Sequence, residues 1–175
     1  MRAFISIHLP ERVIKKIKKI QKEIERQHLF IGKMTKPENL HLTLKFLNEI
    51  SEEQAEDIKK KLGEIDFSKF KAKLSFAGVF SETHIRIIWL KIENCDELQK
   101  LIDEKLKDMF NKEERFMAHL TIARVKKLDD REKLKQEVKK IHLNEDFLVD
   151  GFYLMKSFLK SEGPEYKVIE EFKLK

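Results

Sequence analysis

The 175-residue chain is long enough to bury a substantial core, and we expect one domain of two lobes over residues 1–175. Its formal net charge of +6, with 39% of residues charged and both signs mixed, favours an anionic partner without singling out nucleic acid. The single cysteine, Cys95, excludes an intramolecular disulfide and a metal site built from cysteines. No apolar run approaches the roughly 20 residues of a membrane span and no signal-peptide pattern is present, so we expect a cytoplasmic protein that does not bind membranes.

Apolar residues alternate with period two in the expected strands and recur at helical spacing in the expected helices. In chain order, the pattern predicts a strand over residues 3–9, a helix over 10–27, strands over 29–34 and 40–47, a helix over 51–63, strands over 70–80 and 84–92, a helix from Asn94 or Asp96 to about 109, a strand over 116–125, a helix over 129–141, and strands over 148–158 and 165–174. Ser51 and Gln54 form a capping box for the second helix. His142 is placed at the end of the fourth helix, where its charge would suit the helix dipole. These elements predict an α+β fold of two antiparallel sheets with helices on the outside.

One short sequence occurs twice: His-Leu-Thr-Leu at residues 41–44 returns as His-Leu-Thr-Ile at residues 119–122. Because the side chains of a strand alternate between its faces, the histidine and threonine of each copy share one face and the aliphatic residues share the other. Two such strands facing a common cleft would bring together two imidazoles and two hydroxyl donors. Hydroxyls can hydrogen-bond phosphate oxygens, and histidine, with a pKa of about 6.5, can take or give a proton near neutrality. The repeat therefore predicts a phosphate site with an acid and a base.

Strict alternation also places Lys45 on the face of His41, where it would add positive charge at the rim of the cleft. Arg86 is a candidate contact to a base or a phosphate, whereas Trp89 in the same predicted strand is expected to pack. His8 is expected to be structural or exposed. Lys45 and Arg86 are therefore open candidates for substrate contact.

The paired motifs and their flanks resemble the 2H phosphoesterase superfamily, and within it the bacterial and archaeal RNA 2′,3′-cyclic phosphodiesterases, also called 2′-5′ RNA ligases. The segments that carry the resemblance are spread over almost the whole chain, at residues 1–5, 37–47, 86–89, 116–125 and 163–166. Ala118 stands where the family usually has proline before the second motif, and Asn48 stands where a glycine commonly follows the first. Both departures concern the shape of strands and turns rather than the chemistry.

The resemblance implies a bilobal, pseudo-twofold-symmetric fold with a central cleft, no cofactor and no required metal, and hydrolysis of RNA 2′,3′-cyclic phosphate ends to 2′-phosphomonoesters. By the same resemblance His41 is the general acid, His119 is the general base, and Thr43 and Thr121 bind the substrate phosphate. Arg124 matches a family arginine that binds substrate phosphate. Strict alternation from His119 would send Arg124 to the core face, unless the strand ends or bulges before it.

The direction of the reaction stays open, since the same proton transfers run backwards would join a phosphate end to a 5′-hydroxyl and form a 2′-5′ link. The expected partners are RNA ends, such as tRNA fragments, or nucleotides, bound by a monomer. A non-catalytic RNA- or nucleotide-binding module with the same cleft is the alternative, although such a module needs no pair of imidazoles. A two-histidine metal hydrolase is disfavoured because no Asp, Glu or Cys lies at ligand spacing around either motif.

Overall fold

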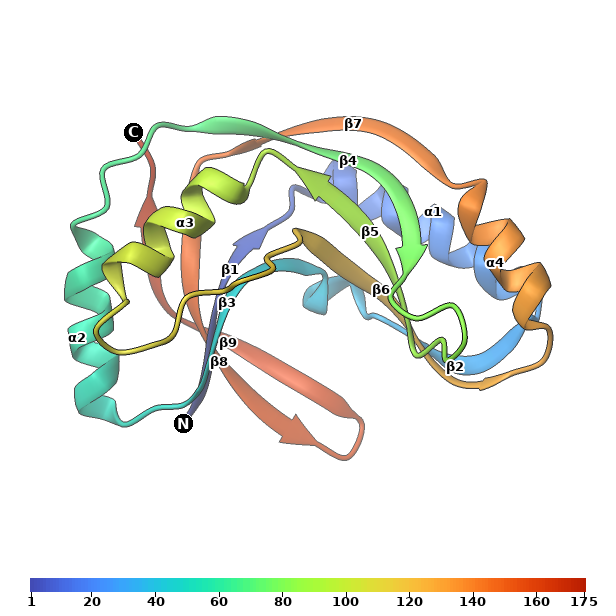
Figure 1. Ribbon diagram of the computed structural model, residues 1–175, viewed down its shortest axis with the longest axis horizontal. Coiled ribbons are helices and arrows are strands. Elements are labelled where there is room, and N and C mark those ends of the chain that lie inside the picture. The colour runs from blue at the N-terminus through green and yellow to red at the C-terminus, as the bar shows by residue number, and fades with distance from the viewer.

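The structure is a computed structural model that describes residues 1–175 (Figure 1). Its strands are β1 (Arg2–His8), β2 (Phe30–Met34), β3 (His41–Glu49), β4 (Phe70–Val79), β5 (Ile87–Glu93), β6 (His119–Leu128), β7 (His142–Val149), β8 (Gly151–Lys160) and β9 (Gly163–Lys173). Its helices are α1 (Glu11–Arg26), α2 (Glu52–Gly63), α3 (Asp96–Lys105) and α4 (Arg131–Lys139), with a 3₁₀ turn, η1 (Pro37–Asn39), before β3. None of the helices is both long and apolar enough to cross a membrane.

The strands form two antiparallel sheets, which confirms the predicted α+β fold. One sheet has four strands in the order β3-β1-β8-β9, and the other has five strands in the order β2-β6-β5-β4-β7. Each sheet contains one copy of the repeated motif, in β3 and in β6. These two strands contact each other near the middle of the molecule, although they belong to different sheets (Figure 1). The two strands that carry the motif therefore meet where the sheets adjoin.

Two of the four helices, α1 and α3, cross from one half of the molecule to the other. Helix α1 follows a strand of the four-stranded sheet but packs against β6 of the five-stranded sheet. Helix α3 follows a strand of the five-stranded sheet but packs against β3 of the four-stranded sheet, next to α2. Figure 1 shows the result, with α2 and α3 gathered at one end of the molecule and α1 and α4 at the other. This exchange gives the fold its pseudo-twofold character.

A single hydrophobic cluster of 40 buried residues draws on both sheets and on all four helices. Helix α1 contributes Val13, Ile17 and Ile24, which lie on one face because they recur at helical spacing. The aliphatic residues of both motifs are part of the same cluster: Leu42, Leu44, Leu120 and Ile122. The side of each motif strand that the alternation assigns to the core is thus buried.

The C-terminal third differs from the sequence prediction. The strand predicted over residues 148–158 is wrong in its boundaries, because β7 and β8 are two strands that turn at Asp150. His142 does not end a helix: α4 stops at Lys139, and His142 begins β7 opposite Phe76 of β4. Strand β7 lies at the edge of its sheet, and its apolar alternation is interrupted because Glu145 lies on the inward face and Leu148 on the outward face.

Candidate active site

Strand β3 has a β-bulge directly after its threonine. Thr43 and Lys45 pair with consecutive residues of β1, which leaves Leu44 as the extra residue. The bulge reverses the alternation, so Lys45 points inward and is 2% exposed, whereas Phe46 points outward and is 64% exposed. The predicted position of Lys45 at the rim of the cleft is therefore wrong. Its side chain is buried in an ion pair with Asp103 instead.

Strand β6 repeats the same irregularity. Thr121 and Ala123 pair with consecutive residues of β5, which leaves Ile122 as the extra residue. Ala123 is consequently buried, and Arg124 is exposed on the face of the motif threonine. The sequence had left open whether the strand bulges before Arg124, and the structure shows that it does.

Arg124 reaches the boundary between the two sheets. Burial raises the pKa of the Tyr166 phenol, and the positive charges of Arg124 and Arg2 partly offset this effect. Tyr166 belongs to β9 of the four-stranded sheet, whereas Arg124 belongs to the five-stranded sheet. The positive charge of Arg124 in one sheet therefore influences the titration of a side chain in the other.

The imidazole ring of His41 is held by two groups that are close to it in the sequence. Its Nδ1 lies 2.7 Å from the carbonyl oxygen of Asn39, and its Nε2 lies 3.0 Å from Oγ1 of Thr43. A carbonyl oxygen can only accept, so Nδ1 carries the proton and Nε2 of the neutral ring is an acceptor. Burial lowers the pKa of His41 to about 4, which the bond to Asn39 opposes and the nearby His8 reinforces. In the free protein His41 is therefore neutral at pH 7.

His119 is held in the same way. Its Nδ1 lies 2.7 Å from the carbonyl oxygen of Met117, which is again the residue two positions before the histidine. This carbonyl selects the same tautomer and leaves Nε2 as the free nitrogen. Both copies of the motif therefore present an anchored imidazole on the strand face that also carries a threonine.

Aromatic side chains flank each imidazole. Tyr166 stands edge-on to His41 with ring centroids 5.1 Å apart, and Phe80 stands edge-on to His119 with ring centroids 4.8 Å apart. Phe4 also packs on His41, at 5.0 Å. Sequence reasoning assigned none of these aromatic residues a role. Phe80 is 55% exposed although it is large and apolar, and that exposure is visible only in the folded molecule.

His8 lies beside this site. It is the direct cross-strand partner of His41 on β1, and its ring stacks on Tyr153 with centroids 3.8 Å apart. The Tyr153 hydroxyl donates a hydrogen bond to Glu171. Burial lowers the pKa of His8, and Glu171 acts in the opposite direction. His8 is exposed, as the sequence suggested, but it is close enough to His41 to influence its titration.

Comparison with known proteins identifies the family. A family model described as LigT like Phosphoesterase matches residues 7–89 and 91–166. The chain belongs to this family. It is 36% identical to the RNA 2′,3′-cyclic phosphodiesterase of Methanocaldococcus jannaschii, over 98% of this chain and 100% of that one. It is 33% identical to the protein of the same name from Archaeoglobus fulgidus, over 98% of this chain and 99% of that one.

Solved structures agree with this assignment. TT0787 of Thermus thermophilus superimposes with a TM-score of 0.86 at 29% identity, covering 99% of this chain and 97% of that one. Escherichia coli LigT complexed with 3′-AMP superimposes with a TM-score of 0.77 at 21% identity, covering 99% and 96%, which is a likeness of fold. The resemblance inferred from the paired motifs is confirmed, and the protein is a LigT-like phosphoesterase of the two-histidine type.

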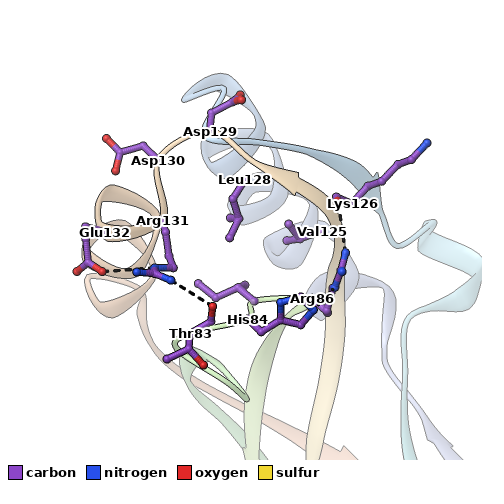
Figure 2. A pocket seen from close by; sticks show the side chains of 11 residues that line it. Thr83, His84, Arg86, Val125, Lys126, Leu128, Asp129, Asp130, Arg131 and Glu132 are labelled. Atoms are coloured by element: carbon purple, nitrogen blue, oxygen red, sulfur yellow. Dashed lines mark hydrogen bonds and ion pairs between the residues drawn. The ribbon is translucent and has the colours of Figure 1, made fainter.

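Arg86 lies away from the two histidines of this LigT-like phosphoesterase. Its guanidinium donates to the carbonyl oxygen of Lys126, near the far end of β6 from His119, and to Nε2 of His84. Figure 2 shows these residues lining a separate pocket together with Arg131 and Glu132 of α4. Arg86 is therefore occupied in holding the loop before β5 onto β6.

The groups near the motif histidines of this LigT-like phosphoesterase show what the site can bind. No three side chains of the types His, Cys, Asp or Glu lie close enough together to bind a metal ion. The groups around the motif histidines are the Thr43 hydroxyl, backbone carbonyls, aromatic rings and the imidazole of His8. These groups suit a phosphate and proton transfer better than a divalent cation.

Proposed function

We propose that this LigT-like phosphoesterase hydrolyses RNA 2′,3′-cyclic phosphate ends to 2′-phosphomonoesters, without a metal, by general acid-base catalysis. The observation that carries the proposal is the matched anchoring of His41 and His119. In each ring a backbone carbonyl occupies Nδ1, and Nε2 is left for proton transfer. The relatives that are 36% and 33% identical over nearly the whole chain carry the name of this activity, which supports the same substrate class.

In the proposed reaction, Nε2 of His119 takes a proton from a water molecule as its oxygen attacks phosphorus. The bond between phosphorus and the 3′ oxygen breaks, and Nε2 of protonated His41 gives its proton to that oxygen. The products are a 2′-phosphomonoester and a 3′-hydroxyl. Thr43 and Thr121 donate hydrogen bonds to the non-bridging oxygens, and Arg124 offsets their negative charge.

The acid role requires His41 to gain a proton when substrate binds. Its pKa of about 4 in the free protein leaves the ring neutral at pH 7. A phosphodiester beside the ring supplies a negative charge, which favours the imidazolium and raises the pKa. Substrate binding is therefore coupled to proton uptake at Nε2. The Thr43 hydroxyl, which lies 3.0 Å from that nitrogen in the free protein, turns to the phosphate.

The deciding experiment uses a short RNA with a 2′,3′-cyclic phosphate end in excess chelator, with the product identified as a 2′- or 3′-monophosphate. We expect a 2′-monophosphate at an undiminished rate. His41→Ala and His119→Ala should each lower turnover by about 10²- to 10⁴-fold, because each removes one proton transfer. His84→Ala, an exposed histidine outside the cleft, is the matched control.

Three outcomes would contradict the proposal in different ways. Loss of activity in chelator would point to a metal hydrolase. Binding of the RNA without turnover would favour the nucleotide-binding module. A 3′-monophosphate product would mean that the bond between phosphorus and the 2′ oxygen breaks instead of the bond to the 3′ oxygen. Escherichia coli LigT has been crystallised with 3′-AMP, so a nucleotide occupies a protein of this fold.

The proposal extends to the reverse reaction and to the partner. The same two proton transfers run backwards would join a cyclic phosphate or 2′-phosphate end to a 5′-hydroxyl, so a mixture of such ends should yield 2′-5′ linked RNA. We propose RNA ends such as those of tRNA fragments as the partner, bound in the cytoplasm by a monomer. Size-exclusion chromatography of the protein with and without RNA tests the oligomeric state.

A further inference from the structure

Buried polar side chains are rare in the core of this molecule. None of these side chains takes part in the proposed chemistry. Lys45 is 2% exposed, Asp103 4%, Gln99 2% and Gln21 6%. Burying such groups is unfavourable unless they are fully hydrogen-bonded. All four are hydrogen-bonded, unlike the fifth buried polar side chain, Ser6, and all of these bonds except that between Gln99 and Asp103 join residues 14 or more positions apart.

The first network, here called the lysine brace, starts at the bulge of β3. Nζ of Lys45 lies 2.5 Å from Oδ1 of Asp103 on α3 and donates to the carbonyl oxygen of Asn111 at 2.7 Å. Oδ2 of Asp103 accepts from the backbone N–H of Glu113 at 2.9 Å and from Gln99 at 2.8 Å. The brace thus ties the first motif strand to the segment over residues 111–118, which leads into the second motif.

The second network, here called the glutamine brace, starts at the bulge of β6. Nε2 of Gln21 on α1 donates to the carbonyl oxygen of Ile122, the extra residue of the bulge, at 2.9 Å. The same nitrogen donates to the carbonyl oxygen of Thr35 at 2.9 Å, and the Thr35 N–H donates to Ile122. Thr35 begins the segment that leads into the first motif.

The two braces correspond to each other under the pseudo-twofold relation. In each case a bulge directly after the motif threonine is linked, through a buried side chain on a crossing helix, to the segment entering the other motif. Ladder hydrogen bonds do not pair β3 with β6, because these two strands belong to different sheets. The sheets fix each histidine within its own lobe, and the braces add side-chain links between each bulge and the segment that enters the other motif.

We propose that the two braces fix the separation and relative orientation of the two imidazoles, so that Lys45, Asp103 and Gln21 are positioning residues. The inference rests on the proposed function of the two histidines. A buried ion pair is a weak source of stability, since an uncharged replacement of similar volume is often as stable. Geometry is the more sensitive quantity, because a misplacement of about 1 Å can lower a rate by about 10²-fold.

Burial raises the pKa of Asp103, but hydrogen bonds from Lys45, Glu113 and Gln99 outweigh this and hold it below its usual value. The carboxylate therefore stays ionised at neutral pH, and the lysine brace remains intact under the conditions in which the reaction is expected to run.

The experiment distinguishes an effect on the positions of the two imidazoles from an effect on the stability of the fold. Lys45→Met alone leaves a buried carboxylate without its cation, so its unfolding midpoint should fall. In Lys45→Met with Asp103→Asn, no charge is stranded and the amide can still bond Glu113 and Gln99, so the midpoint should recover. The link from β3 to residues 111–113 stays cut, and kcat on the cyclic phosphate RNA should remain lowered by about 10- to 100-fold with KM little changed.

The matched control makes the same kind of substitutions on the outer side of α3. Lys105 and Glu64 form an ion pair 3.1 Å long, and Lys105→Met with Glu64→Gln should leave kcat at the wild-type value. Gln21→Met tests the glutamine brace independently and should lower kcat without changing KM. A double variant that regains both stability and kcat would overturn the proposal, as would equal losses in the control.

A readout that does not depend on turnover distinguishes this inference from the proposed function. Inorganic phosphate is titrated while the imidazole resonances of His41 and His119 are followed by NMR. We expect both rings to respond at one phosphate affinity in the wild type, and in the double variant at least one ring to respond at several-fold weaker affinity. Wild-type responses of both rings in the double variant would contradict the positioning role of the brace, whether or not the RNA assay succeeds.

Discussion

At the scale of single residues, the chemistry depends on which ring nitrogen is free. The carbonyl two residues before each motif histidine occupies Nδ1, at 2.7 Å in both copies. This contact is local in the sequence, and in the first copy the carbonyl belongs to the last residue of η1. The sequence therefore predicted the identity of both imidazoles, but it could not show that a carbonyl sets their tautomer.

Arg124 supports a prediction at the same scale. Its exposed guanidinium comes after the bulge of β6 and acts on Tyr166 across the sheet boundary. Arg124→Met should weaken binding of inorganic phosphate and raise KM for the cyclic phosphate RNA by about 10- to 100-fold, because a hydrogen bond to a charged group contributes about 1.5–3 kcal/mol. Isothermal titration and steady-state kinetics measure the two effects.

Lys126→Met is the control, because Lys126 is an exposed cation two residues farther along the same strand. Loss of a general electrostatic attraction would affect both variants alike, whereas a specific contact is lost only with Arg124. Equal effects of the two substitutions would remove Arg124 from the proposed phosphate site.

At the scale of elements, the bulges of β3 and β6 decide which side chains after each motif turn inward and which turn outward. Each inserts one unpaired aliphatic residue after the threonine, so the next residue turns inward and the one after it turns outward. This is why Lys45 is buried and Arg124 is exposed. Period-two reasoning is reliable up to Thr43 and Thr121 and fails beyond them, because a bulge depends on the register of the neighbouring strand.

Strand β2 provides a test of the close packing along β6. A Cβ at Gly32 would stand 2.1 Å from the carbonyl oxygen of Arg124, which is backbone and cannot move aside. Gly32→Ala should therefore lower the free energy of unfolding by about 1–3 kcal/mol, the usual cost of overpacking. Chemical denaturation with urea measures the change.

Gly63 is the matched control for this substitution. It is the last residue of α2, and a Cβ there would meet nothing within 4 Å. Gly63→Ala should be neutral or stabilise the protein by up to about 1 kcal/mol, because alanine loses less conformational freedom in a helix. A loss of stability at Gly63 as large as that at Gly32 would contradict the packing argument.

At the scale of the whole molecule, folding lowers the pKa of two histidines, His41 and His8. Burial lowers the pKa of His41 from 6.5 to about 4 and also lowers that of His8. Between pH 6.5 and about 4 the unfolded chain binds more protons than the folded one. The free energy of unfolding should therefore fall as the pH drops through this range. Thermal midpoints measured across this range should show the decline.

His41→Asn should flatten that dependence, because it removes the histidine with the larger burial effect on its pKa. His28→Asn is the control: His28 is exposed and has a φ of 51°, which asparagine tolerates. A slope in His41→Asn that matches the wild type would show that His41 titrates alike in both states.

The local features of this protein follow from its amino-acid sequence alone. The amphipathic face of α1 and the Ser51–Gln54 capping box depend on residues a few positions apart, and both form as predicted. The α+β class results from the same periodicities, and the repeated motif identified the family. Such features survive because the interactions that produce them lie within one turn or one strand.

How the two halves meet depends on contacts between segments that are distant in the sequence. Lys45 is buried because Asp103, on a helix that crosses from the other half, offers it a partner, and that pairing leaves no mark in the sequence around either residue. The contact of β3 with β6, the place of Arg124 and the edge strand β7 likewise depend on the register and packing of distant segments. These are long-range contacts, and local pattern carries no information about them.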